Sequence, residues 1–192
     1  MGASLISDRH AHPPLPVVAG FSGAALALEI LLLRLLAIVH WHHFAYFVIT
    51  IALLGYGASG TLVTLGRDRL VRHWHGTLAG SAVAFAAAAP LSFLLAQRVP
   101  FNALEVAWGP GPWLHLGTIA LLLALPFLCA ATGLAVCLAA YPGRAAQVYA
   151  ADLLGAGLGA VGVLALLQVR TPLEALQAVT GLAGLAAAGA LH

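Results

Sequence analysis

Two charged residues stand inside a long apolar stretch of the chain. Glu29 lies close to the midpoint of the run 15–39, and Arg34 follows five residues later. An ionised carboxylate at the centre of a membrane span costs about 2.5–3.5 kcal/mol on insertion scales, so such a group is typically paired, protonated or exposed to water. On an ideal helix the two side chains project about 140° apart, so an ion pair needs bent side chains or another helix as intermediary. We predict a polar site inside a helix bundle, with a charge network that fixes helix rotation as the alternative.

A third charged residue, Asp152, lies about one turn inside the apolar run 148–169. One interpretation is a first-turn acid that the helix dipole favours. The other is a carboxylate that pairs with arginines such as Arg67 or Arg144 and gates the inner mouth of the bundle. With Glu29 and Arg34, Asp152 completes the predicted intramembrane polar site.

Histidine is frequent, with nine in the chain, and several lie near the ends of apolar runs on one predicted side. Imidazoles grouped in this way can bind a transition metal or haem. The candidates are His40, His42, His43 and His115. No carboxylate or cysteine completes an obvious ligand set, and Trp41 and Trp113 beside them are typical of an interfacial aromatic belt. We therefore predict no metal and no cofactor.

Glycines recur at helical spacing in two runs. The segment 55–60 matches the letters of a dinucleotide fingerprint, but that motif works in a turn between a strand and a helix, which an apolar run does not provide. Small residues every fourth position instead predict close helix packing. The predicted packing residues are Gly55 and Ser59 in one run and Ala151, Gly155 and Gly159 in another. The frames Leu53–Gly57 and Leu153–Gly157 also resemble each other, which would fit a three-plus-three inverted repeat.

The composition predicts an integral membrane protein. Of 192 residues, 62% are hydrophobic and 7% charged, whereas about a quarter of a soluble domain is charged. Every basic residue is arginine, so enzymes that need a reactive lysine are excluded, and a net charge of +2 argues against nucleic-acid binding. The lipid bilayer is the expected partner.

Six apolar runs are long enough to cross a bilayer of about 30 Å. They cover 15–39, 44–65, 77–97, 114–141, 148–169 and 173–191. We therefore predict an all-α membrane protein, with a tail over 1–14 and one six-helix transmembrane domain over 15–192. Pro90 and Pro126 lie inside the third and fourth runs and are expected to kink them.

The arginines orient the bundle. If the connecting segments alternate between two sides, one side carries Arg9, Arg67, Arg69, Arg72 and Arg144, and the other carries Arg98 and Arg170. Because positively charged loops stay in the cytoplasm, this distribution predicts that both termini are cytoplasmic.

Three segments together resemble a known family. They are Ser22–Leu36, which contains Glu29 and Arg34, Leu54–Gly57, and Tyr149–Ala160, which contains Asp152. These segments look like the membrane module of the spermidine synthase-like multi-pass proteins, in which a helix bundle distantly similar to part of a major-facilitator transporter precedes a soluble aminopropyltransferase-like domain. The resemblance implies a bacterial inner (cytoplasmic) membrane. The soluble domain would follow the membrane part and is absent from this chain, so we expect no aminopropyltransferase activity.

Several functions fit this pattern. The first is binding or passage of a small polar or cationic solute, or anchoring of a soluble synthase-like partner. The alternatives are a transporter half that forms a homodimer, a haem- or metal-binding redox subunit, and a structural subunit of a membrane complex.

The arginine count gives a testable topology. Reporter fusions after His75 and after Trp108 should report opposite sides of the membrane, with the segment Arg67–Arg72 cytoplasmic. A periplasmic signal after His75 would show that the arginine count is misleading here.

Overall fold

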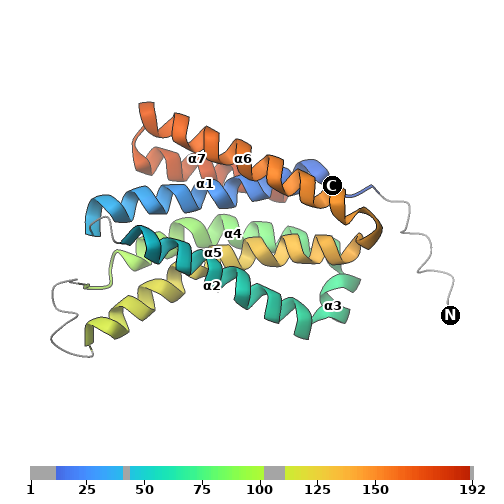
Figure 1. Ribbon diagram of the computed structural model, residues 1–192, viewed down its shortest axis with the longest axis horizontal. Helices are drawn as coiled ribbons and strands as arrows, with labels where there is room; N and C mark the ends of the chain where they lie inside the picture. Colours follow the sequence, from blue (N-terminus) through green and yellow to red (C-terminus); the bar gives the residue numbers. More distant parts are fainter. Residues whose placement is uncertain (1–11, 41–43, 102–110, 191–192) are drawn as a thin grey trace.

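The computed structural model describes residues 12–40, 44–101 and 111–190, and within these ranges it is helical with no strand (Figure 1). The helices are α1 (Leu15–His40), α2 (Phe44–Leu65), α3 (Arg67–Arg72), α4 (Trp74–Ala96), α5 (Gly111–Ala140), the 3-10 turn η3 (Pro142–Arg144), α6 (Ala145–Val169) and α7 (Pro172–Ala190). All of the α-helices except α3 are long and apolar enough to cross a membrane. The predicted all-α bundle of six spans is confirmed.

Several helices begin earlier than the apolar runs suggest. The helices α4, α5 and α6 each start three residues before the predicted span, because Trp74, Gly111 and Ala145 are compatible with a helix although they open no apolar run. The segment after Gly66, expected as a loop, forms the short helix α3, whose first turn holds Asp68 at the favourable end of the helix dipole. The earlier start of α6 places Asp152 about two turns inside the helix rather than one.

The six spans form two layers (Figure 1). In the upper layer α1 packs against α6 and α7, and in the lower layer α5 packs against α2 and α4. Contacts between α4 and α7 and between α1 and α2 join the layers. The first span therefore pairs with the fifth and sixth, and the fourth span pairs with the second and third. Helices from the two halves of the chain therefore pack against each other in both layers. The three-plus-three inverted repeat stays a prediction.

The α1–α6 contact brings two helix backbones together. A Cβ atom on Gly155 would overlap the backbone of Ala19, and one on Gly159 would overlap the backbone of Gly23. Since Ala19 and Gly23 are four residues apart, α1 presents a small-residue stripe that matches the stripe on α6. At this distance Cα–H groups of one helix can also contact carbonyl oxygens of the other.

The α2–α5 contact in the lower layer is built in the same way around Gly55. A Cβ atom there would lie 2.7 Å from Cβ of Phe127, 2.8 Å from O of Ala124 and 2.9 Å from N of Leu128. Gly55 thus allows α2 to approach α5. In Figure 1, α5 changes direction part-way along its length, and it contains Pro126 internally, as expected for a proline kink.

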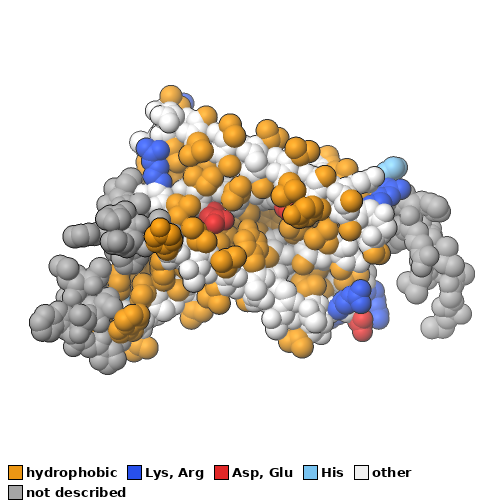
Figure 2. All heavy atoms as spheres, in the orientation of Figure 1, with side chains coloured by type: hydrophobic (Ala, Val, Ile, Leu, Met, Phe, Trp, Pro, Cys, Tyr) orange, Lys and Arg blue, Asp and Glu red, His pale blue; other side chains and the backbone are white. Residues whose placement is uncertain are grey.

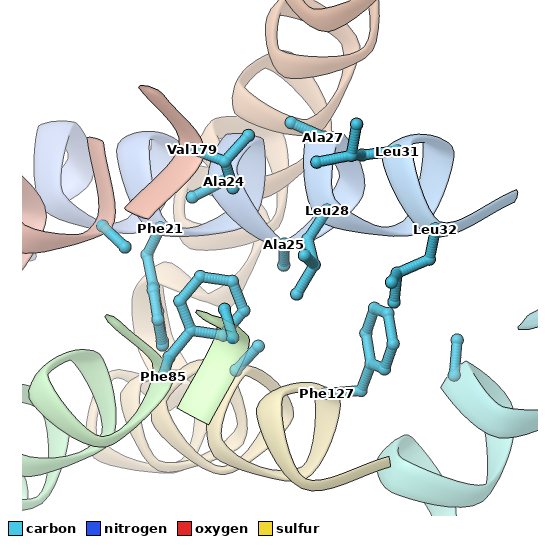
Figure 3. Close-up of a cluster of buried hydrophobic side chains, with 14 of the residues drawn as sticks. Phe21, Ala24, Ala25, Ala27, Leu28, Leu31, Leu32, Phe85, Phe127 and Val179 are labelled. Carbon is cyan, nitrogen blue, oxygen red and sulfur yellow. The ribbon is translucent and has the colours of Figure 1, made fainter. Parts of the chain in front are cut away.

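Aromatic side chains fill the space between the layers. The rings of Phe21 and Phe85 meet edge to face with centroids 5.5 Å apart, which links α1 to α4. Figure 3 shows Leu28 and Leu32 directed from α1 toward the lower layer, where Phe127 is fully buried. The packing of these leucines and of Phe127 between the layers sets the distance from one layer to the other.

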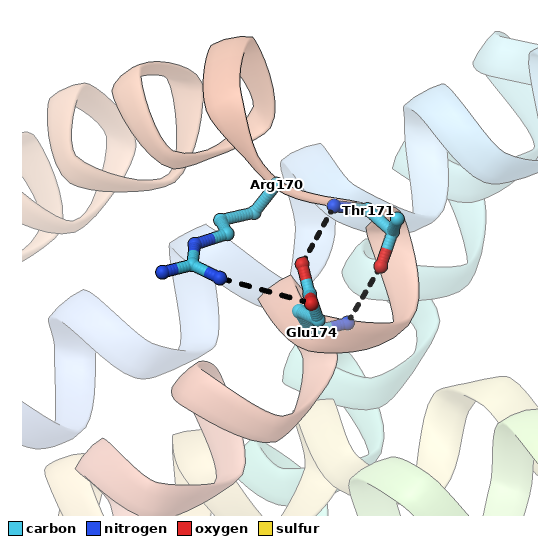
Figure 4. A network of polar contacts seen from close by, with 3 residues as sticks. All are labelled: Arg170, Thr171 and Glu174. Atoms are coloured by element: carbon cyan, nitrogen blue, oxygen red, sulfur yellow. Dashed lines mark hydrogen bonds and ion pairs between the residues drawn. The ribbon is translucent and has the colours of Figure 1, made fainter.

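A capping box starts α7 (Figure 4). The backbone N–H of Thr171 donates to Oε2 of Glu174 at 3.0 Å, and the N–H of Glu174 donates to Oγ1 of Thr171 at 3.4 Å. Arg170 lies 3.8 Å from the same carboxylate in an exposed pair, which contributes little to stability. Glu174 therefore caps the beginning of α7 and does not place a charge inside the span.

Gly155→Ala should destabilise the protein, because the new methyl group overlaps backbone that cannot move without separating α1 from α6. We expect a loss of at least about 1–3 kcal/mol, the usual cost of overpacking. Thermal unfolding in mild detergent measures the effect. The matched control is Gly157→Ala, where a Cβ has open space, and which should leave Tm unchanged or slightly raised. Equal Tm values for the two variants would contradict the proposed close contact.

Candidate functional site

A cavity of about 180 Å³ lies between the two layers. Residues of α1, α2, α5 and α6 line it, and three of them are polar: Ser22, Tyr56 and Asp152. A larger cavity of about 360 Å³ between α1, α6 and α7 is lined by glycine and apolar side chains only. Because convergent polar groups mark binding sites, the smaller cavity is the candidate functional site.

A hydrogen bond joins the two helices of the upper layer at this cavity. The hydroxyl of Ser22 donates to Oδ1 of Asp152 at 2.5 Å in a partly buried position. Each residue lies seven positions after the start of its helix, about 10 Å along the axis at helical rise. Asp152 is thus held well inside an apolar span.

The hypothesis that Asp152 pairs with cytoplasmic arginines does not match this geometry. Within residues 12–40, 44–101 and 111–190, Asp152 forms no ion pair. Arg144 instead donates from Nη1 to Nδ1 of His12 at 3.1 Å, and Arg67 is exposed on α3. Arg144 is thus bonded to His12 at the start of α6, whereas Asp152 is bonded to Ser22 about two turns further along the helix.

Tyr56 brings the lower layer into the site. Its ring packs against Phe127 with centroids 6.2 Å apart, and 37% of the residue is exposed. Tyr56 lines the cavity from α2, opposite Ser22 of α1 and Asp152 of α6.

Glu29 lies near the middle of α1 and is partly buried. It forms no hydrogen bond or ion pair with another residue of the described ranges. Because Ser22 and Glu29 are seven residues apart, they share one helix face, about 10 Å from each other along the axis. Arg34 is exposed and does not pair with Glu29. Of the three predicted polar residues, Asp152 lines the cavity, Glu29 lies on the same face of α1 as Ser22, and Arg34 is exposed.

The surface of the protein shows the same separation of acidic from basic side chains. Figure 2 shows carboxylate atoms midway along the face where the layers meet, while arginine atoms lie toward the ends of that face. No arginine is among the described residues that line the cavity. The carboxylates near the middle of this face therefore have no ion-pair partner among the described side chains.

Sequence reasoning did not single out Ser22 and Tyr56. The available signal for Ser22 was its position two turns before Glu29, which puts both on one helix face. Tyr56 lies between Gly55 and Gly57 in the segment that we interpreted as packing. A residue next to a close helix contact is held in a fixed position. The place of Tyr56 beside Gly55 was therefore the signal in the sequence that could have identified it.

The predicted packing residues lie on α2 and α6. Gly55, Gly155 and Gly159 occupy the close contacts described above, and Ala151 is partly buried. Ser59 is buried, and its Oγ has no hydrogen-bond partner in the described part of the chain.

The structure describes the side chain of only one of the four histidines proposed as metal ligands. His115 is partly buried on α5, whereas the side chains of His40, His42 and His43 lie outside the described residues. Among the described residues, no three His, Cys, Asp or Glu side chains come together as metal ligands. The absence of a metal or haem stays a prediction.

The six apolar helices define the chain as a multi-pass α-helical membrane protein. No protein-family model matches it, and neither the curated proteins nor the solved structures contain a significant match. The functional argument therefore rests on the geometry of the cavity.

Ser22→Ala should destabilise the protein, because it removes the hydrogen bond between α1 and α6 and leaves the Asp152 carboxylate without that donor. Hydrogen bonds to charged groups contribute about 1.5–3 kcal/mol, so a loss of this size is expected. Thermal unfolding in detergent provides the measurement. Ser59→Ala is the control, since it removes a buried hydroxyl without a partner and should be neutral or stabilising. A neutral Ser22→Ala would show that the bond contributes little.

Proposed function

We propose that this protein binds a small cationic solute in the cavity between its layers and passes it across the membrane. The observation that carries the proposal is the carboxylate of Asp152 in the wall of the cavity, beside Ser22 and Tyr56, with no basic side chain among the described residues that line it. Glu29, further along the same face of α1, is a second intramembrane carboxylate without an ion pair among the described residues. A cation is the ligand that this charge distribution attracts.

Electrostatics supports a cation over a neutral or anionic solute. Ionised carboxylates inside a span are costly, and a bound cation would offset part of that cost. An anion would meet like charge, which disfavours binding in a site of low dielectric. The solute would therefore stabilise the folded protein when it binds.

The position of the cavity also supports passage through the bundle. Residues from both layers line it. In each layer, a helix from one half of the chain packs against two helices from the other half. Many transporters place their binding sites between internal repeats, near the middle of the bilayer. Relative motion of the layers would open the cavity toward either side.

The resemblance extends this proposal. The protein would be a membrane module of the spermidine synthase-like kind in a bacterial inner membrane, with both termini cytoplasmic. The arginines of α3 and Arg144 support this orientation, since they lie at the end of the bundle where α7 finishes (Figure 1). A soluble synthase-like partner would then be anchored at the same end.

Binding can be tested by thermal shift on the purified protein. Ammonium and methylammonium chlorides should raise Tm, since a ligand at one hundred times its Kd adds about 2.7 kcal/mol. Sodium acetate and sodium butyrate should not raise it.

Asp152→Asn should remove most of this shift and Glu29→Gln a smaller part of it, because Asp152 lines the cavity and Glu29 does not. Both substitutions keep the shape of the side chain and remove its charge, so insertion should be preserved. Glu174→Gln is the matched control, since Glu174 caps α7 at an exposed end and should leave the shift intact. Equal stabilisation by the anions, or no stabilisation by any cation, would overturn the proposal.

A further inference from the structure

We infer that the solute is an organic monoammonium cation with a short apolar body. The inference rests on the proposed function and narrows it, because it distinguishes such a cation from an inorganic ion and from a hydrophilic dication. It follows from the division of the cavity wall into one polar part and one larger apolar part.

The polar part suits an ammonium group. Ser22 engages Oδ1 of Asp152, and no described residue forms a hydrogen bond with Oδ2, so one carboxylate oxygen is available to an N–H donor. An ammonium group carries several such donors. The ring of Tyr56, also in the wall, can contribute a cation–π contact.

An inorganic cation fits the same wall poorly. An inorganic cation must exchange hydration water for the four side-chain oxygens of Ser22, Tyr56 and Asp152, fewer than the roughly six or more that Ca²⁺ takes, and it gains nothing from the apolar part of the wall. Backbone carbonyls inside α1 and α6 are engaged in helical hydrogen bonds and add none. Consistent with this shortage, the described residues contain no group of metal-ligating side chains.

The rest of the wall suits a hydrocarbon. Phe21, Leu26 and Leu134 line it together with three alanines. Burying methylene groups against such side chains strengthens binding, roughly four-fold for each methylene. The volume of about 180 Å³ limits the body to a small one, since sites for drug-sized ligands occupy about 300–1,000 Å³.

A second positive charge on the ligand would have no second carboxylate to pair with among the described residues that line the cavity. Glu29 is about 10 Å beyond Ser22 along α1 and is not among the residues that line the wall. The far ammonium of a linear diamine would therefore lie against leucine and phenylalanine. Charged groups bury unfavourably in such surroundings.

The test compares n-alkylammonium chlorides by thermal shift and by calorimetry on the full chain in lipid nanodiscs. Affinity should rise about four-fold per methylene from methylammonium to n-butylammonium. 1,4-Diaminobutane should bind at least about ten-fold more weakly than n-butylammonium, and sodium, potassium and magnesium chlorides should not compete.

Two variants locate the ligand. Asp152→Asn should remove binding of the whole series, whereas Leu134→Ser should retain methylammonium binding and flatten the dependence on chain length. Circular dichroism and the Tm of each variant without ligand establish that it is folded.

The outcomes separate the inference from the proposed function. Diamine binding as tight as that of n-butylammonium, competition by inorganic cations, or an unchanged chain-length dependence in Leu134→Ser would overturn the inference and leave a cation site. Failure of every cation to bind would overturn both.

Discussion

The close approach of α1 and α6 is the contact on which the rest of the structure depends. Apolar side chains gain little by leaving lipid for another helix, so spans associate through close packing and polar contacts. Gly155 and Gly159 supply this packing against Ala19 and Gly23. The same contact sets the polar geometry, because Ser22 adjoins Gly23 and Asp152 precedes Gly155 by three residues. Once the glycines meet, the hydroxyl and the carboxylate are brought within hydrogen-bonding distance.

The lower layer repeats this arrangement with different chemistry. Gly55 brings α2 against α5, and Tyr56, the next residue, faces the cavity from the opposite side. Each polar residue of the site therefore lies within three positions of a close helix contact, where the backbone has little freedom. A site of this kind is held by its scaffold on both sides, and the ligand meets groups that are already placed. The expected consequence is that packing variants and binding variants will affect each other.

The number of spans and the position of Glu29 near the middle of the first span could be predicted from sequence, because both depend on the length and position of apolar runs. The helix partners could not, since the lipid-facing and bundle-facing sides of a span are both apolar and leave no periodic signal. The stripe on α6 was visible in Gly155 and Gly159, but its counterpart at Ala19 and Gly23 became clear only from the contact. Likewise, Ser22 and Asp152 are 130 positions apart, and no local pattern joins them.

A charge network that fixes helix rotation was the alternative explanation for Glu29, and it requires a partner. Arg34 is exposed and does not pair with Glu29, and no other described side chain forms an ion pair with Glu29. Asp152 recovers part of its burial cost through Ser22, whereas Glu29 retains a cost of about 2.5–3.5 kcal/mol if it is ionised. Glutamine at this position would avoid that cost and keep the shape. Among the described side chains, Glu29 has no partner for a structural charge network, and the proposed attraction of a cation toward Asp152 would give its charge a role.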